Sequence, residues 1–174
     1  MPRANALFYD DDPTNFRGAN ARGRHPAVHT MLLQQALTAD QLRKALEAFH
    51  AASANADGPT PFFFFDFDGT LTLRDGLLSL DGKDDLSAVF GSADRRRALQ
   101  VTLGTLLAAG RCYILTANMA HQRVADILNG LLGSSNSNIS ARFVADDTVR
   151  FAPAGTKLEQ LEAIIKQQGF ALVR

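Results

Sequence analysis

The sequence predicts an α/β sandwich with a mainly parallel central sheet, and three observations lead to this fold class. Short apolar runs alternate along the chain with segments of helical periodicity. Several of these runs end abruptly in aspartate or threonine, as strands do when polar residues gather at the carboxyl edge of a parallel sheet. The 174 residues, 46% hydrophobic and 21% charged, suit one compact domain, residues 1–174, with its own core.

Five apolar runs are predicted to be strands because each is short and bounded by turn residues or acids. They are residues 6–9, 27–33, 62–65, 112–115 and 142–145. The first two are short enough to be buried strands of a parallel sheet. The third, FFFF, is the most apolar, and DFDGTLT follows it directly.

Four segments are predicted to be helical: 38–52, 93–109 before Gly110, 119–132, and 156–169 ending at Gly169. Thr38 with Gln41, and Thr156 with Glu159, have the spacing of capping boxes at two of the helix starts. The intervening segments 54–61, 71–92 and 133–138 are rich in turn residues and predict connections, and residues 13–26 can form at most a brief helix.

Composition excludes several classes of function. Eighteen basic residues balance eighteen acidic ones and the pI is near 6.9, so binding to nucleic acid or to an anionic membrane surface is not expected. The single cysteine, Cys112, rules out an intrachain disulfide and is expected to be a small core residue. No apolar run has the length of a membrane span and MPRANALFYDDD does not resemble a signal peptide, so we expect a cytoplasmic protein.

Six polar residues are candidates for a site because they follow predicted strands or open the last helix: Asp10, Asp11, Asp66, Asp68, Thr116 and Lys157. The carboxyl ends of parallel strands share one edge of a sheet, so we expect these side chains to converge. Carboxylates held close together need a cation, and hard oxygen ligands favour Mg²⁺, which shares its coordination shell with phosphate.

This set of residues therefore predicts phosphate chemistry. One aspartate can attack phosphorus, and a second acid two residues later can protonate the departing oxygen and then activate water. Thr116 and the amides after Asp66 can hold phosphoryl oxygens, and Lys157 can balance the negative charge.

Other polar residues are better explained by local structure. Asp12 is interpreted as a turn residue, Asn118 as a loop organiser, and Asp146 with Asp147 as a turn or helix cap. Arg95–Arg97 is interpreted as an exposed basic face, with docking of a phosphorylated chain as the functional alternative.

Three motifs resemble those of the haloacid dehalogenase superfamily in their usual order: DFDGTLT at 66–72, YILTAN at 113–118 and GTK at 155–157. The fourth motif of that family, a strand ending in paired acids, would follow the lysine. Here FYDDDPTN at 8–15 resembles it instead, so we interpret the chain as a circular permutation. The domain then consists of a moved strand pair and helix (1–53), a connector (54–61) and the remainder (62–174).

The resemblance implies a Rossmann-like core and a Mg²⁺-dependent phosphatase. Asp66 would be the nucleophile, and Asp68 the general acid and base. The metal would be held by the carboxylates of Asp66 and Asp10, the main-chain carbonyl of Asp68, and Asp11 directly or through water. Thr116 and Lys157 would position phosphate and nucleophile. The intervals at 71–92 and 146–154 leave no room for a large cap domain. The resemblance therefore implies an open site and a macromolecular substrate such as a phosphoprotein.

A receiver domain of two-component signalling is the alternative. It forms an aspartyl phosphate with Mg²⁺, and DDDPTN, Asp66, LTAN and Lys157 occur in its motif order without permutation. The motif spacings are longer than those of a compact receiver, and residues 16–26 cannot supply a full amphipathic helix. A receiver also has no need for an acid at position 68, which a phosphatase uses for turnover.

Overall fold

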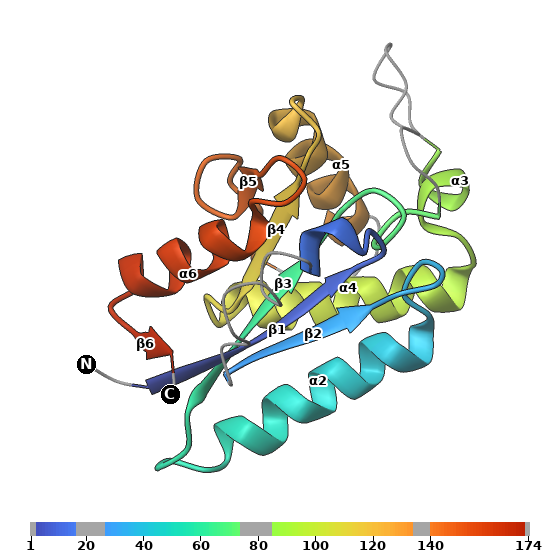
Figure 1. The fold of residues 1–174 in the computed structure, drawn as a ribbon. Helices are drawn as coiled ribbons and strands as arrows, with labels where there is room; N and C mark the ends of the chain where they lie inside the picture. The colour runs from blue at the N-terminus through green and yellow to red at the C-terminus, as the bar shows by residue number, and fades with distance from the viewer. Residues whose placement is uncertain (1–2, 17–26, 74–84, 134–139, 173–174) are drawn as a thin grey trace.

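The computed structural model describes residues 3–16, 27–73, 85–133 and 140–172 (Figure 1). The strands in these ranges are β1 (Arg3–Asp10), β2 (Val28–Leu32), β3 (Thr60–Phe65), β4 (Cys112–Thr116), β5 (Val149–Phe151) and β6 (Ala171–Leu172). The helices are α2 (Ala39–Ser53), α3 (Leu86–Phe90), α4 (Ala93–Ala108), α5 (His121–Gly133) and α6 (Lys157–Gln167).

The strands form one parallel sheet in the order β2-β1-β3-β4-β5, which confirms the predicted α/β class. This is the order of flavodoxin-like doubly wound sheets. The short strand β6 pairs with the start of β1, where Arg3 lies opposite Ala171 and Ala4 opposite Leu172. The two described ends of the chain therefore lie side by side. A circular permutation also predicts that residues 1 and 174 are close in space, and these residues lie outside the described ranges.

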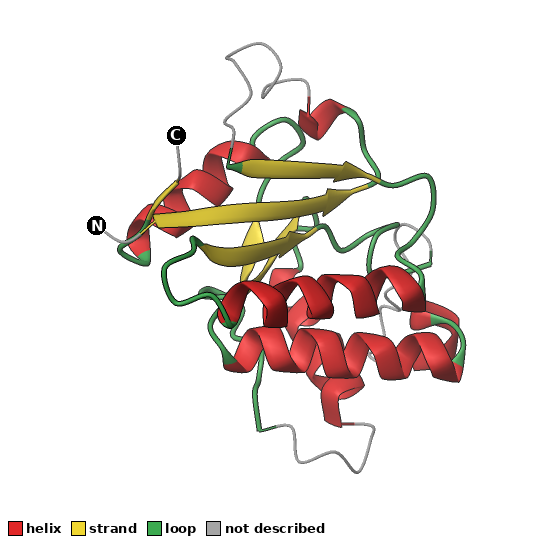
Figure 2. Ribbon diagram, turned by 90° about the horizontal axis from the view of Figure 1, so that it is seen from below, coloured by secondary structure: helices red, strands yellow, loops and turns green. Residues whose placement is uncertain are grey.

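Helices cover both faces of the sheet and produce three layers (Figure 2). Buried side chains of α2, α4 and α5 form the larger core with one face of the strands, and those of α6 form the smaller core with the other. Alternate residues of β3 enter the two cores, Phe63 and Phe65 the larger and Phe62 and Phe64 the smaller. The aromatic run is thus explained by a central strand that is buried on both faces.

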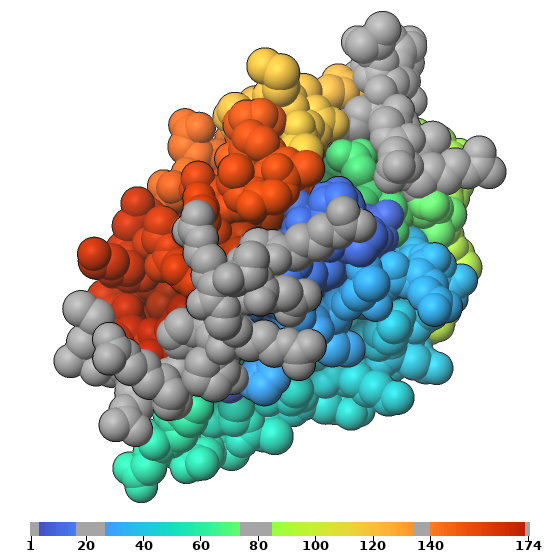
Figure 3. All heavy atoms as spheres, in the orientation of Figure 1, coloured from blue at the N-terminus to red at the C-terminus, as the bar shows by residue number. Residues whose placement is uncertain are grey.

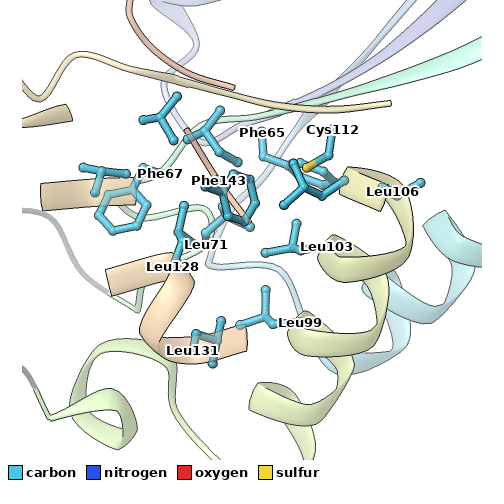
Figure 4. Packing of buried hydrophobic residues seen from close by; sticks show 14 of the residues in the cluster. Phe65, Phe67, Leu71, Leu99, Leu103, Leu106, Cys112, Leu128, Leu131 and Phe143 are labelled. Carbon is cyan, nitrogen blue, oxygen red and sulfur yellow. The ribbon is translucent and has the colours of Figure 1, made fainter. Parts of the chain in front are cut away.

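The larger core continues beyond the sheet beneath the turn that follows β3. Phe67 and Leu71 from this turn pack with Leu99 and Leu103 of α4 and with Leu128 of α5 (Figure 4). Because these side chains are fully buried, the backbone that carries DFDGTLT is fixed by hydrophobic packing.

The two predicted capping boxes have different outcomes. At the start of α2, the Gln41 N–H donates to Thr38 Oγ1 and the Thr38 N–H donates to Gln41 Oε1, which confirms the first box. At the start of α6, Thr156 makes no side-chain cap and its hydroxyl donates to the Pro153 carbonyl at 2.8 Å. The second box is wrong because Thr156 is tied back into the preceding loop.

Three further expectations need correction. Residues 142–145 are not a strand, because the Asn129 side chain accepts from the Phe143 N–H and donates to the Phe143 carbonyl. The strand in this part of the chain is β5, at Val149–Phe151. The second strand, β2, is an exposed edge strand rather than a buried one. The interval 71–92 contains a short helix, α3, that the turn-rich composition did not predict.

Within the described ranges, no helix combines the length and the apolar character needed to cross a membrane.

Candidate active site

Three of the predicted carboxylates meet at the carboxyl edge of the sheet. Asp10 is the last residue of β1, Asp11 follows it, and Asp66 follows β3, the neighbouring strand. One oxygen from each carboxylate lies within 4.8 Å of the others. In Figure 3 the blue surface after β1 adjoins the orange-red surface before α6, which brings distant parts of the chain to this edge.

Lys157, the first residue of α6, bridges two of these carboxylates. Its Nζ donates to Asp10 Oδ2 at 2.9 Å and to Asp66 Oδ1 at 2.5 Å. All three side chains are buried, with exposed fractions between 0% and 7%. A lysine at a helix N-terminus opposes the helix dipole, and the two carboxylates compensate for that unfavourable position. The predicted convergence of Asp10, Asp66 and Lys157 is confirmed.

Asn15 belongs to the same cluster, although the sequence analysis did not select it. Its Nδ2 donates to Asp10 Oδ2 at 2.8 Å, and its Oδ1 accepts from the Gly155 N–H at 2.9 Å. Asn15 is buried and therefore ties a carboxylate of the site to the loop that delivers Lys157. The motif DDDPTN contains Asn15 and could have indicated it as a candidate, but nothing in the motif predicts the contact between Asn15 and Gly155.

Asp12 is confirmed as a turn residue. Its carboxylate accepts from the N–H and the hydroxyl of Thr14 at 2.8 and 2.7 Å, and its own N–H donates to Asp10 Oδ1 at 2.8 Å. The turn therefore orients Asp10 through the backbone.

Burial shifts the pKa values in this cluster. The pKa of Asp66 is raised to about 7, chiefly by desolvation at the end of the aromatic strand. Lys157 opposes this shift, and the Asp10 carboxylate adds to it. Burial alone lowers the pKa of Lys157, but the attraction of Asp66 and Asp10 outweighs it and leaves that pKa raised. The lysine is therefore cationic at neutral pH, and Asp66 is poised between its two protonation states.

Asp68 lies in the tight turn after β3 and is half-buried. The turn is closed by the Phe67 carbonyl, which accepts from the N–H groups of Leu71 and Thr72, both at 3.0 Å. Gly69 has a φ of 70°, a conformation that a side chain would disfavour, which explains the glycine of DFDGT. The acid at i+2 is thus carried by a rigid turn beside Asp66.

Thr116 is fully buried at the end of β4, the strand next to β3. Its hydroxyl accepts from the Asn118 N–H at 3.0 Å, and Asn118 Oδ1 accepts from the Ala120 N–H. Asn118 is confirmed as a loop organiser. Thr116 occupies the predicted edge of the sheet, although its described hydrogen bond is to its own loop rather than to the carboxylates.

The expectation of an exposed basic face is wrong for Arg95. That side chain is buried, and its guanidinium donates to four backbone carbonyls, whereas Arg96 is half-buried and Arg97 exposed. Asp146 and Asp147 lie in a turn, as predicted, and Cys112 is a buried core residue.

The donor set at this edge fits a hard divalent cation. Asp10, Asp11 and Asp66 offer carboxylate oxygens close enough to share one ion. Nitrogen and sulfur ligands are absent from this set, which favours Mg²⁺ over Zn²⁺.

Comparison of the chain with protein-family models, with curated proteins and with solved structures gave no match.

Proposed function

We propose that the protein is a Mg²⁺-dependent phosphatase that hydrolyses phosphomonoesters through an aspartyl phosphate on Asp66. The observation that carries this proposal is the buried cluster in which Lys157 bridges Asp10 and Asp66 beside a third carboxylate, Asp11. Asp68 follows the nucleophile at i+2, the position that a general acid and base requires.

Asp10, Asp11 and Asp66 would hold the metal, with the Asp68 carbonyl as a further ligand suggested by the family resemblance. Bound Mg²⁺ would neutralise carboxylate and phosphate charge and polarise the phosphoryl oxygens.

In the first step the Asp66 carboxylate attacks phosphorus, the bond to the leaving oxygen breaks, and Asp68 donates a proton to that oxygen. In the second step Asp68 takes a proton from water, the water oxygen bonds to phosphorus, and the Asp66–phosphorus bond breaks to release phosphate. Lys157 holds Asp66 Oδ1 throughout and offsets negative charge. Thr116, at the end of the adjacent strand, is placed to contact a phosphoryl oxygen.

The substrate we propose is a macromolecule, such as a phosphoprotein. Only residues 152–156 separate β5 from α6, and the interval between β3 and α4 holds one short helix in its described part. Such short intervals leave the carboxyl edge without a large enclosing domain.

We interpret the chain as a circularly permuted relative of the haloacid dehalogenase superfamily. The pairing of β6 with the start of β1 supports this interpretation, because it brings the described end of the chain to the strand that would follow it in the unpermuted order.

A receiver domain is the second candidate, and the strand order favours it specifically. The order 2-1-3-4-5 is that of flavodoxin-like sheets, a class that includes receiver domains. In this chain the acids Asp10 and Asp11 come at the end of β1, and Asp66, the phosphate acceptor of a receiver, follows β3. Under this alternative Asp66 would be phosphorylated once per molecule, without sustained turnover.

One experiment separates the two candidates. Steady-state hydrolysis of a chromogenic aryl phosphate is measured with Mg²⁺ and with a chelator, for the wild type and for Asp66→Asn. Sustained Mg²⁺-dependent release that the variant lacks is the expected result. Stoichiometric labelling of Asp66 by a small phosphodonor, with no turnover, would identify a receiver instead.

A further inference from the structure

Arg95, near the start of α4, makes an unusual set of contacts for a buried cation. Its Nε donates to the Leu37 carbonyl at 2.6 Å and its Nη1 to the Phe90 carbonyl at 2.6 Å. Its Nη2 donates to the carbonyls of Leu71 at 2.8 Å and Thr70 at 3.3 Å. Arg95 is 7% exposed, and every described acceptor of its guanidinium is a backbone carbonyl.

These carbonyls belong to three segments that meet at the Arg95 guanidinium. Thr70 and Leu71 lie in the turn that carries Asp68, Phe90 ends α3, and Leu37 precedes α2. The same segments are joined by backbone hydrogen bonds, from the Leu37 N–H to the Thr70 carbonyl at 3.0 Å and from the Leu73 N–H to the Val89 carbonyl at 2.9 Å. The guanidinium is therefore hydrogen-bonded to both ends of the interval between β3 and α4.

We propose that Arg95 is a positioning residue for the candidate site: by holding the carbonyls of Thr70 and Leu71, it fixes the turn that aims Asp68 at the leaving group. The inference rests on the proposed phosphatase function. Arg95 itself has no described contact with the carboxylate cluster or Lys157, so it acts on the site through the turn. The Thr70 hydroxyl of this turn donates to Asp11 Oδ1 at 3.5 Å.

The arrangement calls for arginine in particular. Five N–H donors in a rigid plane can reach carbonyls in three directions at once, whereas a lysine presents donors from a single point. An apolar side chain would leave several buried carbonyls without a partner. Desolvation lowers the pKa of Arg95 to about 10, so the side chain remains cationic at neutral pH and its hydrogen bonds remain charge-assisted.

The test compares two substrates with different leaving groups. An aryl phosphate with a good leaving group needs little protonation, whereas an alkyl phosphate depends on the general acid. In Arg95→Lys and Arg95→Met we expect the first step, measured as release of the leaving group in a single turnover at saturating Mg²⁺, to slow by about tenfold or more for the alkyl phosphate relative to the aryl phosphate. Asp68→Asn should show the same selective loss in the first step, whereas its second step should slow for both substrates because Asp68 also activates water. The KM for the aryl phosphate should change little, because Asp66 and Lys157 are not among the contacts of Arg95. Saturating Mg²⁺ is needed because the same turn carries the Asp68 carbonyl, and its Thr70 hydroxyl donates to Asp11 Oδ1 at 3.5 Å.

Arg97→Met is the matched control, because Arg97 lies on the same helix, is exposed and carries the same charge. It should leave both rates unchanged. Equal loss of the single-turnover rate of leaving-group release on both substrates in the Arg95 variants would show a general structural role and overturn the proposal, as would unchanged rates. Arg95→Lys keeps the charge and carries the test if Arg95→Met does not fold.

Amide hydrogen exchange gives a readout that does not depend on turnover. In Arg95→Lys the Leu37 and Leu73 amides should exchange faster than in wild type, while amides of β3 keep their protection. If the wild type shows no turnover, the proposed function and the role in aiming Asp68 both fail, and exchange alone decides whether Arg95 holds the turn. Wild-type exchange at both amides in Arg95→Lys would overturn that role as well.

Discussion

Asp66 shows how folding and the proposed chemistry make opposite demands on a single residue. Its position after four fully buried phenylalanines places the carboxylate where desolvation disfavours the charged form. The proposed nucleophile must nevertheless be ionised. Lys157 supplies part of the compensation, and a bound divalent cation would supply more. Buried ionisable groups with shifted pKa values are typical of functional sites, and replacing them with apolar residues commonly raises the free energy of unfolding.

The first prediction concerns the pH dependence of stability without metal. The pKa of Asp66 is about 7 in the folded protein and 3.8 in an unfolded chain, so the folded state holds the proton more tightly. The contribution of this tighter proton binding to the free energy of unfolding is fully present below about pH 4, and it is lost as the pH rises through 7. Denaturation in chelator from pH 4 to 8 should therefore show the wild type losing on the order of a few kcal/mol relative to Asp66→Asn. Parallel stability curves for the two proteins would contradict this assignment.

A second prediction concerns Asn15, which links Asp10 to the Gly155 amide. Asn15→Ala should weaken Mg²⁺ binding by about 10- to 100-fold, as loss of an outer-shell partner typically does. It should also lower the free energy of unfolding by about 1–3 kcal/mol, because buried polar groups lose a partner. Calorimetric titration with Mg²⁺ and urea denaturation measure the two effects. Asn55→Ala, at an exposed position, is the control, and an unchanged Mg²⁺ affinity in Asn15→Ala would exclude Asn15 from the site.

At the scale of elements, sequence patterns succeed where local structure decides and fail where tertiary contacts do. Thr38 and Gln41 form their predicted capping box because Thr38 is exposed and its described side-chain hydrogen bonds are all to Gln41. Thr156 has the same pattern, but the loop before α6 is held by Asn15 and the threonine bonds to that loop instead. Residues 142–145 have the composition of a strand, yet Asn129 captures the backbone of Phe143.

The capping box supplies a prediction at this scale. Thr38→Ala should destabilise the protein by about 1 kcal/mol, because the Gln41 N–H at the start of α2 loses its acceptor. Glu47→Ala, an exposed change in the middle of the same helix, should cost much less. Urea denaturation of both variants checks this. A Thr38→Ala protein as stable as Glu47→Ala would show that α2 is held by packing on α4 and β3 alone.

The candidate site was also only partly predictable. Asp10, Asp66 and Lys157 were found because each stands at the end of a strand or the start of a helix, where parallel topology makes such residues converge. Arg95 carried no such signal. It is one of three consecutive arginines, and only the packing of α4 against the turn after β3 distinguishes the buried Arg95 from the half-buried Arg96 and the exposed Arg97.

At the scale of the whole molecule, the parallel sheet is what turns residues scattered along the chain into one cluster. β1 and β3 are neighbours although residues 11–59 separate them, and α6 returns to the same edge from the far end of the chain. The strand order is compatible with a permuted hydrolase and with a receiver, because both place acids at the ends of adjacent strands. The arrangement at the opposite edge, where β6 lies beside the start of β1, is the feature that permits a direct test of permutation.

If the chain is a circular permutation, its ends can be rejoined and opened elsewhere without loss of the fold. Residue 174 is linked to residue 1 through a short Gly/Ser linker, and the chain is opened in the exposed connector between α2 and β3, at residues 54–57. Because Ala171 pairs with Arg3, a few residues suffice to span the join, although β6 must give up part of its pairing. We expect cooperative unfolding, a native circular dichroism spectrum and a Mg²⁺ affinity within about threefold of the wild type, since every bond of the carboxylate cluster is retained.

The same join opened inside β3 is the control and should not fold, because it interrupts the central strand of both cores. A rejoined chain opened at 54–57 that also fails to fold would remove the physical basis for the permutation. The receiver interpretation, which needs no permutation, would then be favoured by the strand order alone.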